Sequence, residues 1–359
     1  MRLRKQAVVV AVAALLSGVA IAAGCSLVTS YEGFTPTAGA LPCPKSIPPR
    51  NPSAPGGGNK TLVGTMNFVR FFAQGDASDL GYDLDNLCTC PGRGACRSKK
   101  EAFGGPCDLP AGSGADNSIG QILKVLYPSA RNEDLIPSIQ AGRFGVVVRI
   151  QGWNGLRDDA DVAVSLFNAV GVNGKSDGTG RATFDGNDGM IVDRSSLLAA
   201  VDFGSKYYDT SAYVTGGLLV AKLDFDFRLE IPNALIDASS VSSVPLRPAF
   251  FIGRIQPVGE GGLKMTDAQL VGRIPAKDVF GQLSGIGLCQ DSGFYEPVKQ
   301  QTCEAMDLPT DPAQTGKDVA CDALSFAIGV SIVPAKLGGI GDAPPAARLC
   351  GDEATDDCR

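Results

Sequence analysis

The sequence predicts a mainly β protein, an antiparallel β-sandwich or jelly roll with a few peripheral helices and a disulfide-rich insert. Short apolar runs recur along the chain and are separated by turns rich in glycine, which contributes 45 of the 359 residues. One run, from Leu223 to Ile231, alternates strictly between apolar and charged residues. This alternation is typical of a strand with one face in the core and the other in water.

Nine apolar runs have the length and composition of strands. They span residues 62–72, 144–150, 162–170, 190–192, 213–220, 223–231, 248–255, 263–271 and 321–333, and the last is expected to end the regular structure. Helical spacing of apolar side chains predicts two short helices, near Ile119–Leu126 and Leu135–Ile139, and a third that begins at Pro275. Many short strands with few helices favour a sandwich.

The amino terminus has the features of a lipoprotein signal peptide over residues 1–24. Three basic residues precede an apolar stretch, residues 7–24, whose length is at the lower limit for crossing a bilayer. Ala22, Ala23 and Gly24 lead into Cys25 and resemble a lipobox, so Cys25 is the expected lipidation site. Ser26 then points to the outer membrane or the cell surface. The alternative is that residues 7–24 stay in place as an uncleaved anchor.

A tether is expected between the lipidated residue and the folded domain. Residues 25–58 contain seven prolines and end in three consecutive glycines, a composition that suits a stiff spacer with a flexible end. Residues 59–359 then form a single β-sandwich domain, with a turn-rich, cysteine-rich insert at about 75–115. Cys43 suggests one fixed point within the tether.

The charge balance restricts the possible partners. Removal of residues 1–24 takes away three basic side chains and no acidic one, which changes the net charge from −6 to −9. A negative chain without a basic cluster in its sequence argues against nucleic acid and against electrostatic attraction to anionic lipid. The expected membrane contact is therefore the lipid anchor alone, in an exported protein.

The chain contains no histidine. Histidine is the usual general base near neutral pH and the commonest ligand of transition metals, so its absence excludes Ser-His-Asp and Cys-His catalysis and histidine metal sites. The sequence at 174–178 matches a G-x-S-x-G nucleophile elbow, but Ser176 has no histidine to activate it. Catalysis, if present, would depend on carboxylates, lysine or tyrosine.

Ten cysteines remain when Cys25 is set aside, and an even number in an exported chain indicates a disulfide framework. They are Cys43, Cys88, Cys90, Cys96, Cys107, Cys289, Cys303, Cys321, Cys350 and Cys358. The alternative for the four cysteines at 88–107 is a zinc site, although they lack the paired C-x2-C spacing of such sites. Each half of the chain holds five cysteines, so complete pairing requires at least one disulfide between the halves.

One segment of the insert resembles a known group of proteins. Gly81-Tyr82-Asp83-Leu84-Asp85, followed by Cys88-Thr89-Cys90-Pro91, Cys96 and Cys107, is similar to exported lipoproteins of myxobacteria whose function is unknown. Cys107-Asp108 and Asp116-Asn117 fit the same resemblance. It implies a location in the cell envelope, and no catalytic residue is carried over with it.

Two aromatic patches could bind a glycan. Trp153 and Asn154 lie in a glycine-flanked turn between two predicted strands, and Tyr207, Tyr208 and Asp209 form a second group. A flat ring can cover the apolar face of a sugar while amides and carboxylates bind its hydroxyl groups. The alternative is that the rings cover the edge of the core.

Two acidic loops could hold a structural calcium ion, the only cofactor that the sequence suggests. They are formed by Asp158, Asp159 and Asp161, and by Asp185, Asn187 and Asp188, although neither has the spacing of an EF-hand.

These observations lead to two hypotheses about function. The first is a surface-tethered, non-catalytic lipoprotein that binds a glycan or an envelope protein, or has a structural role in the envelope. The alternative is a carboxylate-dependent hydrolase such as a glycosidase, with two loop aspartates about 5 to 9 Å apart. The absence of a complete catalytic motif favours the first.

Overall fold

A computed structural model describes residues 43–70, 80–88, 95–97, 114–126, 131–199, 203–223, 226–233, 237–345, 349–350 and 356–358. All of them belong to one compact unit, residues 42–359. The predicted signal peptide, Cys25, Cys90 and Cys107 lie outside the described residues. In the described part of the chain, no helix has the length and hydropathy needed to cross a bilayer.

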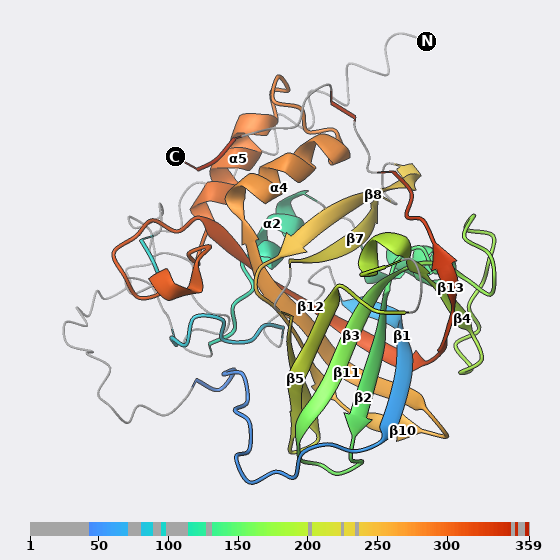
Figure 1. The fold of residues 1–359 in the computed structure, drawn as a ribbon. Helices are drawn as coiled ribbons and strands as arrows, with labels where there is room; N and C mark the ends of the chain where they lie inside the picture. The colour runs from blue at the N-terminus through green and yellow to red at the C-terminus, as the bar shows by residue number, and fades with distance from the viewer. Residues whose placement is uncertain are drawn as a thin grey trace. The chain divides into compact units, whose positions relative to one another are not determined.

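Eight antiparallel strands form a closed barrel (Figure 1). In order around the barrel they are β1 (Lys60–Arg70), β2 (Val146–Trp153), β3 (Asp159–Val172), β5 (Tyr207–Thr215), β6 (Leu218–Leu223), β9 (Ala249–Arg254), β11 (Gly262–Pro275) and β12 (Ala323–Pro334). The barrel closes because β12 pairs with β1, and β3 pairs with β5 as well as with β2. Since the order in space is the order in the chain, this is an up-and-down barrel.

The mainly β class with few helices is confirmed, but the expected sandwich is wrong because one sheet closes on itself. Both architectures show the same alternation of inward and outward side chains along a strand. The feature that separates them here is the pairing of β1 with β12, for example Thr65 with Val333. These strands come from opposite ends of the domain, and no local pattern records their pairing.

Aliphatic side chains fill the barrel interior and also cover part of its outer surface. On β3, Val164 and Leu166 belong to the large interior cluster, whereas Phe167 and Ala169 belong to a second cluster on the outer face. Burial on both faces explains why this strand is a continuous apolar run in the sequence rather than an alternating one.

Further elements surround the barrel. β4 (Gly189–Asp193) and β13 (Lys336–Gly341) extend the sheet beyond β3, β10 (Gln256–Val258) pairs with β11, and β7 (Phe227–Asn233) and β8 (Asp237–Leu246) form a separate hairpin. The helices are α2 (Ile119–Leu126), α3 (Ile136–Gln140), α4 (Ala276–Leu283) and α5 (Tyr295–Glu304). Figure 1 shows α2, α4, α5 and the β7–β8 hairpin towards one end of the barrel and β10 at the other.

Several predicted boundaries need correction. The expected strand 213–220 is a hairpin, because Gly216 and Gly217 have positive φ values of 58° and 85° and turn the chain between β5 and β6. The alternating run 223–231 is shared between the end of β6 and the separate strand β7. Regular structure also continues beyond residue 333, since β13 follows β12, and α5 and β8 were not predicted.

Among the described residues, four disulfides join eight of the ten cysteines. They are Cys43–Cys88, Cys96–Cys321, Cys289–Cys350 and Cys303–Cys358. Cys96–Cys321 connects the insert to the residues just before β12, which confirms the expected bond between the two halves of the chain. Because Cys88 and Cys96 are both oxidised, the alternative zinc site is wrong. Four disulfides are consistent with an extracellular or exported protein.

The second half of the expected tether lies against the barrel. Ala160 donates its backbone N–H to the carbonyl of Pro55 at 3.0 Å, and the Tyr213 hydroxyl donates to the carbonyl of Pro48 at 2.5 Å. The Arg50 guanidinium donates to the carbonyl of Ala160 at 2.9 Å. Proline lacks an N–H but keeps its carbonyl, so this segment can bond to the barrel. A free spacer is therefore the wrong description of residues 43–58.

Candidate functional site

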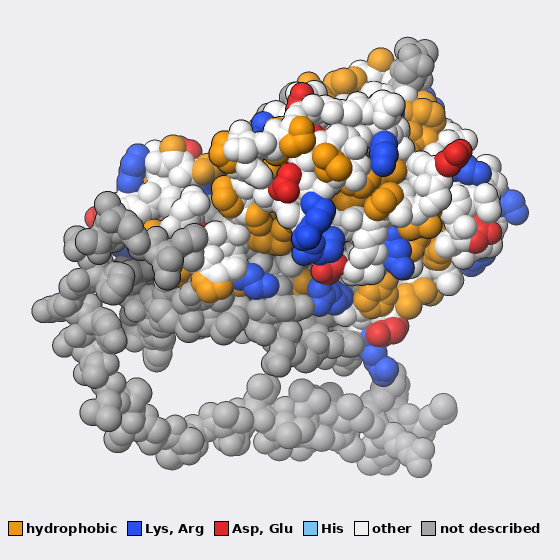
Figure 2. All heavy atoms as spheres, turned by 90° about the horizontal axis from the view of Figure 1, so that it is seen from below, with side chains coloured by type: hydrophobic (Ala, Val, Ile, Leu, Met, Phe, Trp, Pro, Cys, Tyr) orange, Lys and Arg blue, Asp and Glu red, His pale blue; other side chains and the backbone are white. Residues whose placement is uncertain are grey.

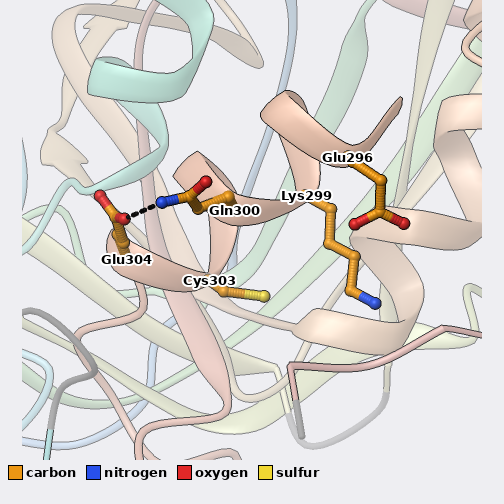
Figure 3. Close-up of a pocket in the computed structure, with 5 residues that line it drawn as sticks. All are labelled: Glu296, Lys299, Gln300, Cys303 and Glu304. Atoms are coloured by element: carbon orange, nitrogen blue, oxygen red, sulfur yellow. Dashed lines mark hydrogen bonds between the residues drawn. The ribbon is translucent and has the colours of Figure 1, made fainter. Parts of the chain in front are cut away.

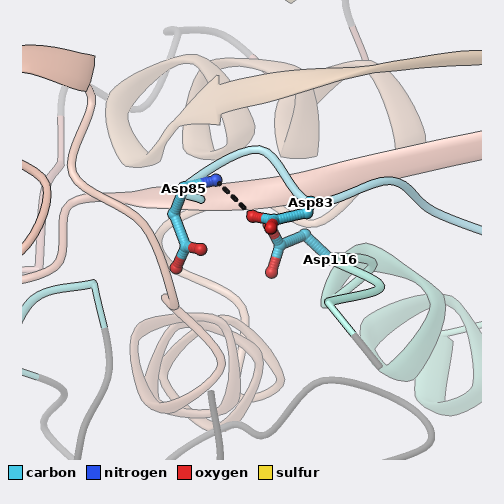
Figure 4. Close-up of side chains that lie close together, drawn as sticks. All are labelled: Asp83, Asp85 and Asp116. Carbon is cyan, nitrogen blue, oxygen red and sulfur yellow. Dashed lines mark hydrogen bonds between the residues drawn. The ribbon is translucent and has the colours of Figure 1, made fainter. Parts of the chain in front are cut away.

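Three buried carboxylates gather where the insert meets the barrel. Asp83 and Asp85 belong to the segment 80–88, and Asp116 precedes α2 (Figure 4). Their side chains are only 3 to 5 % exposed, and one oxygen of each lies within 4.8 Å of the others. This is the only group of three potential metal-ligating carboxylates or cysteines found among the described residues.

Backbone amides of the same segment use these carboxylates as acceptors. One oxygen of Asp83 accepts from the N–H groups of Asp85 at 3.2 Å and Leu87 at 3.1 Å, and Asp85 accepts from Leu87 at 2.7 Å. Asp116 accepts from the N–H of Leu84 at 2.7 Å. The cluster therefore fixes the turn of the GYDLD segment and fastens it to the residues that precede α2.

A buried arginine supplies positive charge beside the cluster. Arg273 of β11 is 1 % exposed and donates to the carbonyl of Leu84 at 2.5 Å and to that of Pro309 at 2.8 Å. Burial lowers the pKa of Arg273, while the nearby charges of Asp85 and Asp116 act in the opposite direction. A buried guanidinium next to carboxylates is favourable only with good hydrogen bonds, and both of its terminal nitrogens have them.

A fourth carboxylate, Asp307, extends this polar region towards β12. It accepts from the Ser118 hydroxyl at 2.9 Å, from the Ser325 N–H at 2.8 Å and from the Ser325 hydroxyl. Burial raises the pKa of Asp307 to about 6, with these hydrogen bonds acting in the opposite direction. The beginning of α2, the residues that follow α5 and the start of β12 therefore meet at one acidic group.

The acidic region acts as a structural clamp: Asp83, Asp85, Asp116 and Arg273 hold the segment 80–88 against the barrel through hydrogen bonds. Carboxylate oxygens are ligands that calcium prefers, but those of Asp83, Asp85 and Asp116 already accept backbone N–H groups, and Arg273 opposes their charge. In the sequence, Asp83 and Asp85 stand out only as part of a resemblance. The signal for the proximity of Asp83 and Asp85 is the D-x-D spacing, in which both acids are buried and Leu84 between them is half-buried.

Neither predicted calcium loop is arranged around a metal position. Asp159 is fully buried and accepts from the N–H groups of Gly57 at 3.1 Å, Asn154 at 2.7 Å and Asp161 at 3.1 Å. Asp158 accepts from the N–H of Gly216, in the turn between β5 and β6, at 3.0 Å. These carboxylates fix the ends of loops, so the first calcium hypothesis has no support from this geometry.

The second loop is similar. Asp188 is 2 % exposed and accepts from the N–H groups of Thr183 at 3.0 Å and Phe184 at 2.6 Å. Asp185 accepts from the N–H of Asn187 at 2.8 Å. The side chain of Asp188 is turned towards its own loop, while Asp185 and Asn187 are exposed. These residues do not converge on a common ligand position.

The aromatic residues proposed for glycan binding are mostly buried. Trp153 is 4 % exposed, and its indole N–H donates to the carbonyl of Leu156 at 3.1 Å. Tyr207 is 6 % exposed and packs edge-on against Phe227, with 5.0 Å between ring centres. An exposed stacking platform is therefore wrong for Trp153 and Tyr207, which cover the edge of the core as the alternative expected.

The polar partners of these rings are also engaged. Asn154 accepts from the N–H of Leu156 at 2.7 Å and donates to the carbonyl of Asp158 at 3.2 Å. Asp209 is 6 % exposed and accepts from the N–H groups of Ser211 and Lys222, both at 2.8 Å. Tyr208 is half-buried. These residues hold strand ends and turns together.

A hollow of about 250 Å³ lies along α5 (Figure 3) and is lined by Glu296, Lys299, Gln300, Cys303 and Glu304. Cys303 is oxidised, Lys299 pairs with Asp356 at 2.7 Å, and Gln300 donates to Glu304 at 2.9 Å. A disulfide sulfur cannot serve as a thiolate nucleophile. The lining therefore offers no activated nucleophile.

Comparison of the chain with protein-family models, with curated proteins and with solved structures finds no match.

Proposed function

We propose that this protein is an exported lipoprotein, anchored through Cys25, whose barrel has a binding or structural role in the cell envelope. The observation that carries the proposal is the Cys43–Cys88 disulfide, which fastens the chain that follows the predicted lipid site to the insert. The insert is in turn joined to the start of β12 by Cys96–Cys321. Tension on the anchor would therefore pass through covalent bonds into the barrel.

A non-catalytic role fits the use of the acidic side chains. The carboxylates of Asp159, Asp188 and Asp209 accept backbone N–H groups, and the acidic cluster at Asp83 does the same. A glycosidase needs two opposed carboxylates that reach a bound sugar. No such pair is found among the loop aspartates considered for it, so the hydrolase alternative gains no support.

The buried aromatic rings also make a glycan less favoured than a partner protein as the ligand. A glycan was proposed because of Trp153 and Tyr207, and both rings are buried in the core. A partner protein or a purely structural role in the envelope therefore becomes the favoured form of the proposal.

The Cys25→Ser variant tests the anchor. Wild-type protein is expected in the detergent phase after phase partitioning, with an acylated amino-terminal peptide by mass spectrometry, because multiple acyl chains anchor stably. Cys25→Ser is expected in the aqueous phase, and the neighbouring substitution Ser26→Ala serves as the control that keeps the cysteine. Unchanged partitioning of Cys25→Ser would contradict the proposal and favour residues 7–24 as an uncleaved anchor.

A further inference from the structure

Three turns and the first residue of β1 meet at the end of the barrel where residues 50–58 lie. The β2–β3 turn and the β5–β6 turn are joined through Asp158, whose carboxylate accepts from the Gly216 N–H at 3.0 Å. The ammonium group of Lys60 lies 5.3 Å from the ring centre of Trp153. Gly261, in the β10–β11 turn, accepts from the backbone N–H of Val63 in β1 at 2.8 Å. These contacts make one continuous surface.

Two guanidinium groups converge on this surface. Arg157 donates to the carbonyl of Gly216 at 3.3 Å, and Arg254 donates to the same carbonyl at 3.1 Å. Both side chains are exposed, as is Lys60. In the part of the chain that the structure describes, no carboxylate lies within 4.0 Å of either guanidinium. Like charges held this close attract an anion from solution.

Two large apolar side chains are exposed in the same turns. Leu156 is 56 % exposed and Val258 is 44 % exposed. The loop that carries Leu156 is fixed, because its N–H donates to Asn154 and its carbonyl accepts from Trp153. Leu156 is therefore presented outward by a rigid turn. Figure 2, which views the protein from this side, shows lysine and arginine side chains near the centre of the face, with hydrophobic side chains and a few acidic ones around them.

We propose that this barrel end, formed by Lys60, Leu156, Arg157, Arg254 and Val258, rests on the anionic phospholipid headgroups of the membrane that holds the lipid anchor. The cations would bind lipid phosphates, and Leu156 and Val258 would enter the headgroup layer. Four acidic residues lie in or beside these turns: Asp158, Asp161, Glu260 and Asp267. In the described part of the chain none of them forms an ion pair with these cations, and Asp158 accepts from the Gly216 N–H.

This inference rests on the proposed lipid anchor, and the path of the chain supports it. Residues 50–58 lie beside the β2–β3 turn, as the bond from Ala160 to Pro55 requires. Residues 25–42 can span on the order of 60 Å when extended, which lets the barrel end reach the membrane. The sequence argued against lipid attraction because its cations are not clustered, but Lys60, Arg157 and Arg254 are brought together only by the closed barrel.

Hydrogen exchange measured by mass spectrometry on the lipidated full-length protein tests the inference. Exchange is compared between detergent micelles and phosphatidylcholine vesicles with about 30 % phosphatidylglycerol. The turns 154–158 and 256–261 are expected to exchange at least about fivefold more slowly on the vesicles. The variant R157E/R254E should lose this protection, whereas K277E/K317E, a matched change of two exposed lysines elsewhere, should keep it.

Equal exchange on micelles and vesicles would overturn the inference, and so would full protection of R157E/R254E. Protection of equal size on vesicles of phosphatidylcholine alone would overturn the role of the cations. Flotation of each variant with the vesicles reports the lipid anchor separately, so loss of flotation by the wild type would refute the proposed function instead. Unchanged exchange in β12 confirms that each variant is folded.

Discussion

The strands of the barrel contain none of the bonded cysteines, whereas the tether, the insert and the carboxy-terminal helices are each fixed by at least one disulfide. Six of the eight barrel strands lie between Cys107 and Cys289, a stretch without any cysteine. These strands bury aliphatic side chains in one continuous cluster. The insert contributes few apolar side chains of its own and is held by disulfides and buried carboxylates.

This difference shows where hydrophobic burial is sufficient and where it is not. A strand that buries several aliphatic side chains gains about 1.5 to 3 kcal/mol for each one. A turn-rich segment cannot bury as much and needs another constraint against its conformational entropy. Substitutions in the two regions should therefore lower the stability by different amounts and for different physical reasons. Four experiments can distinguish these effects.

The largest effect is expected from removal of the disulfide between the two halves of the chain. Cys96 and Cys321 are separated by 225 residues. In the chain-entropy model, a loop of this length stabilises the folded state by about 5 kcal/mol. The C96S/C321S variant should show a large fall in the free energy of unfolding by chemical denaturation, while C289S/C350S, which opens a 61-residue loop, should lose less. A larger loss for the second variant would contradict the comparison.

Trp153→Ala should destabilise the barrel by about 4 kcal/mol, because the ring is buried and its removal leaves a cavity. The sequence alone left open an exposed ring, whose removal would change the melting temperature little. Trp153→Phe is the matched control, since it removes the hydrogen bond to Leu156 but keeps most of the buried volume. A change in melting temperature of less than about 2 °C for Trp153→Ala would place the ring outside the core.

Arg273→Met should cost about 3 kcal/mol, because it leaves Asp85 and Asp116 buried without their nearby positive charge. Arg273→Lys cannot reproduce both bonds to Leu84 and Pro309, so it should also be less stable than the wild type. Because it keeps the positive charge, its loss of stability should be smaller than that of Arg273→Met. Denaturant titration at neutral pH measures both. If Arg273→Met were as stable as the wild type, the clamp beneath the insert would not depend on charge.

The smallest effect concerns the pH dependence of stability. The pKa of Asp307 is about 6 in the folded protein and lies near 3.8 without burial, so the folded state binds more protons between these values. Stability from this group should therefore rise as the pH falls from 7 to 5, by on the order of 1 kcal/mol. In Asp307→Asn the rise should disappear. An unchanged pH profile in this variant would mean that Asp307 does not titrate in this range.

Much of the strand content followed from the sequence. The runs 162–170 and 263–271 fall within β3 and β11, and the run 144–150 overlaps the start of β2, because most of their apolar side chains are buried. The closure of the barrel could not be predicted, since it depends on the register between β1 and β12 at opposite ends of the domain. The parity of the cysteines did predict that at least one disulfide joins the two halves of the chain, and Cys96–Cys321 is such a bond. Counting does not require geometry, but it could not identify the pair.

The sites were harder to predict than the strands. Acidic residues in glycine-rich turns were expected to bind calcium, yet Asp159 and Asp188 accept from backbone amides of the same loops. An aspartate side chain beside a turn often accepts hydrogen bonds from nearby backbone N–H groups. The contact of Asp83 and Asp85 with Asp116 spans about thirty residues and depends on the fold, as does the convergence of Arg157 and Arg254.

The central claim is that disulfides join the tether, the insert and the carboxy-terminal helices to the barrel, including one bond between the two halves of the chain. Non-reducing peptide mapping of the exported protein tests it most directly. We expect the pairs Cys43–Cys88, Cys96–Cys321, Cys289–Cys350 and Cys303–Cys358, and complete oxidation would leave Cys90 and Cys107 for each other. Bonds confined to each half of the chain, with Cys96 and Cys321 recovered as free thiols, would contradict the account.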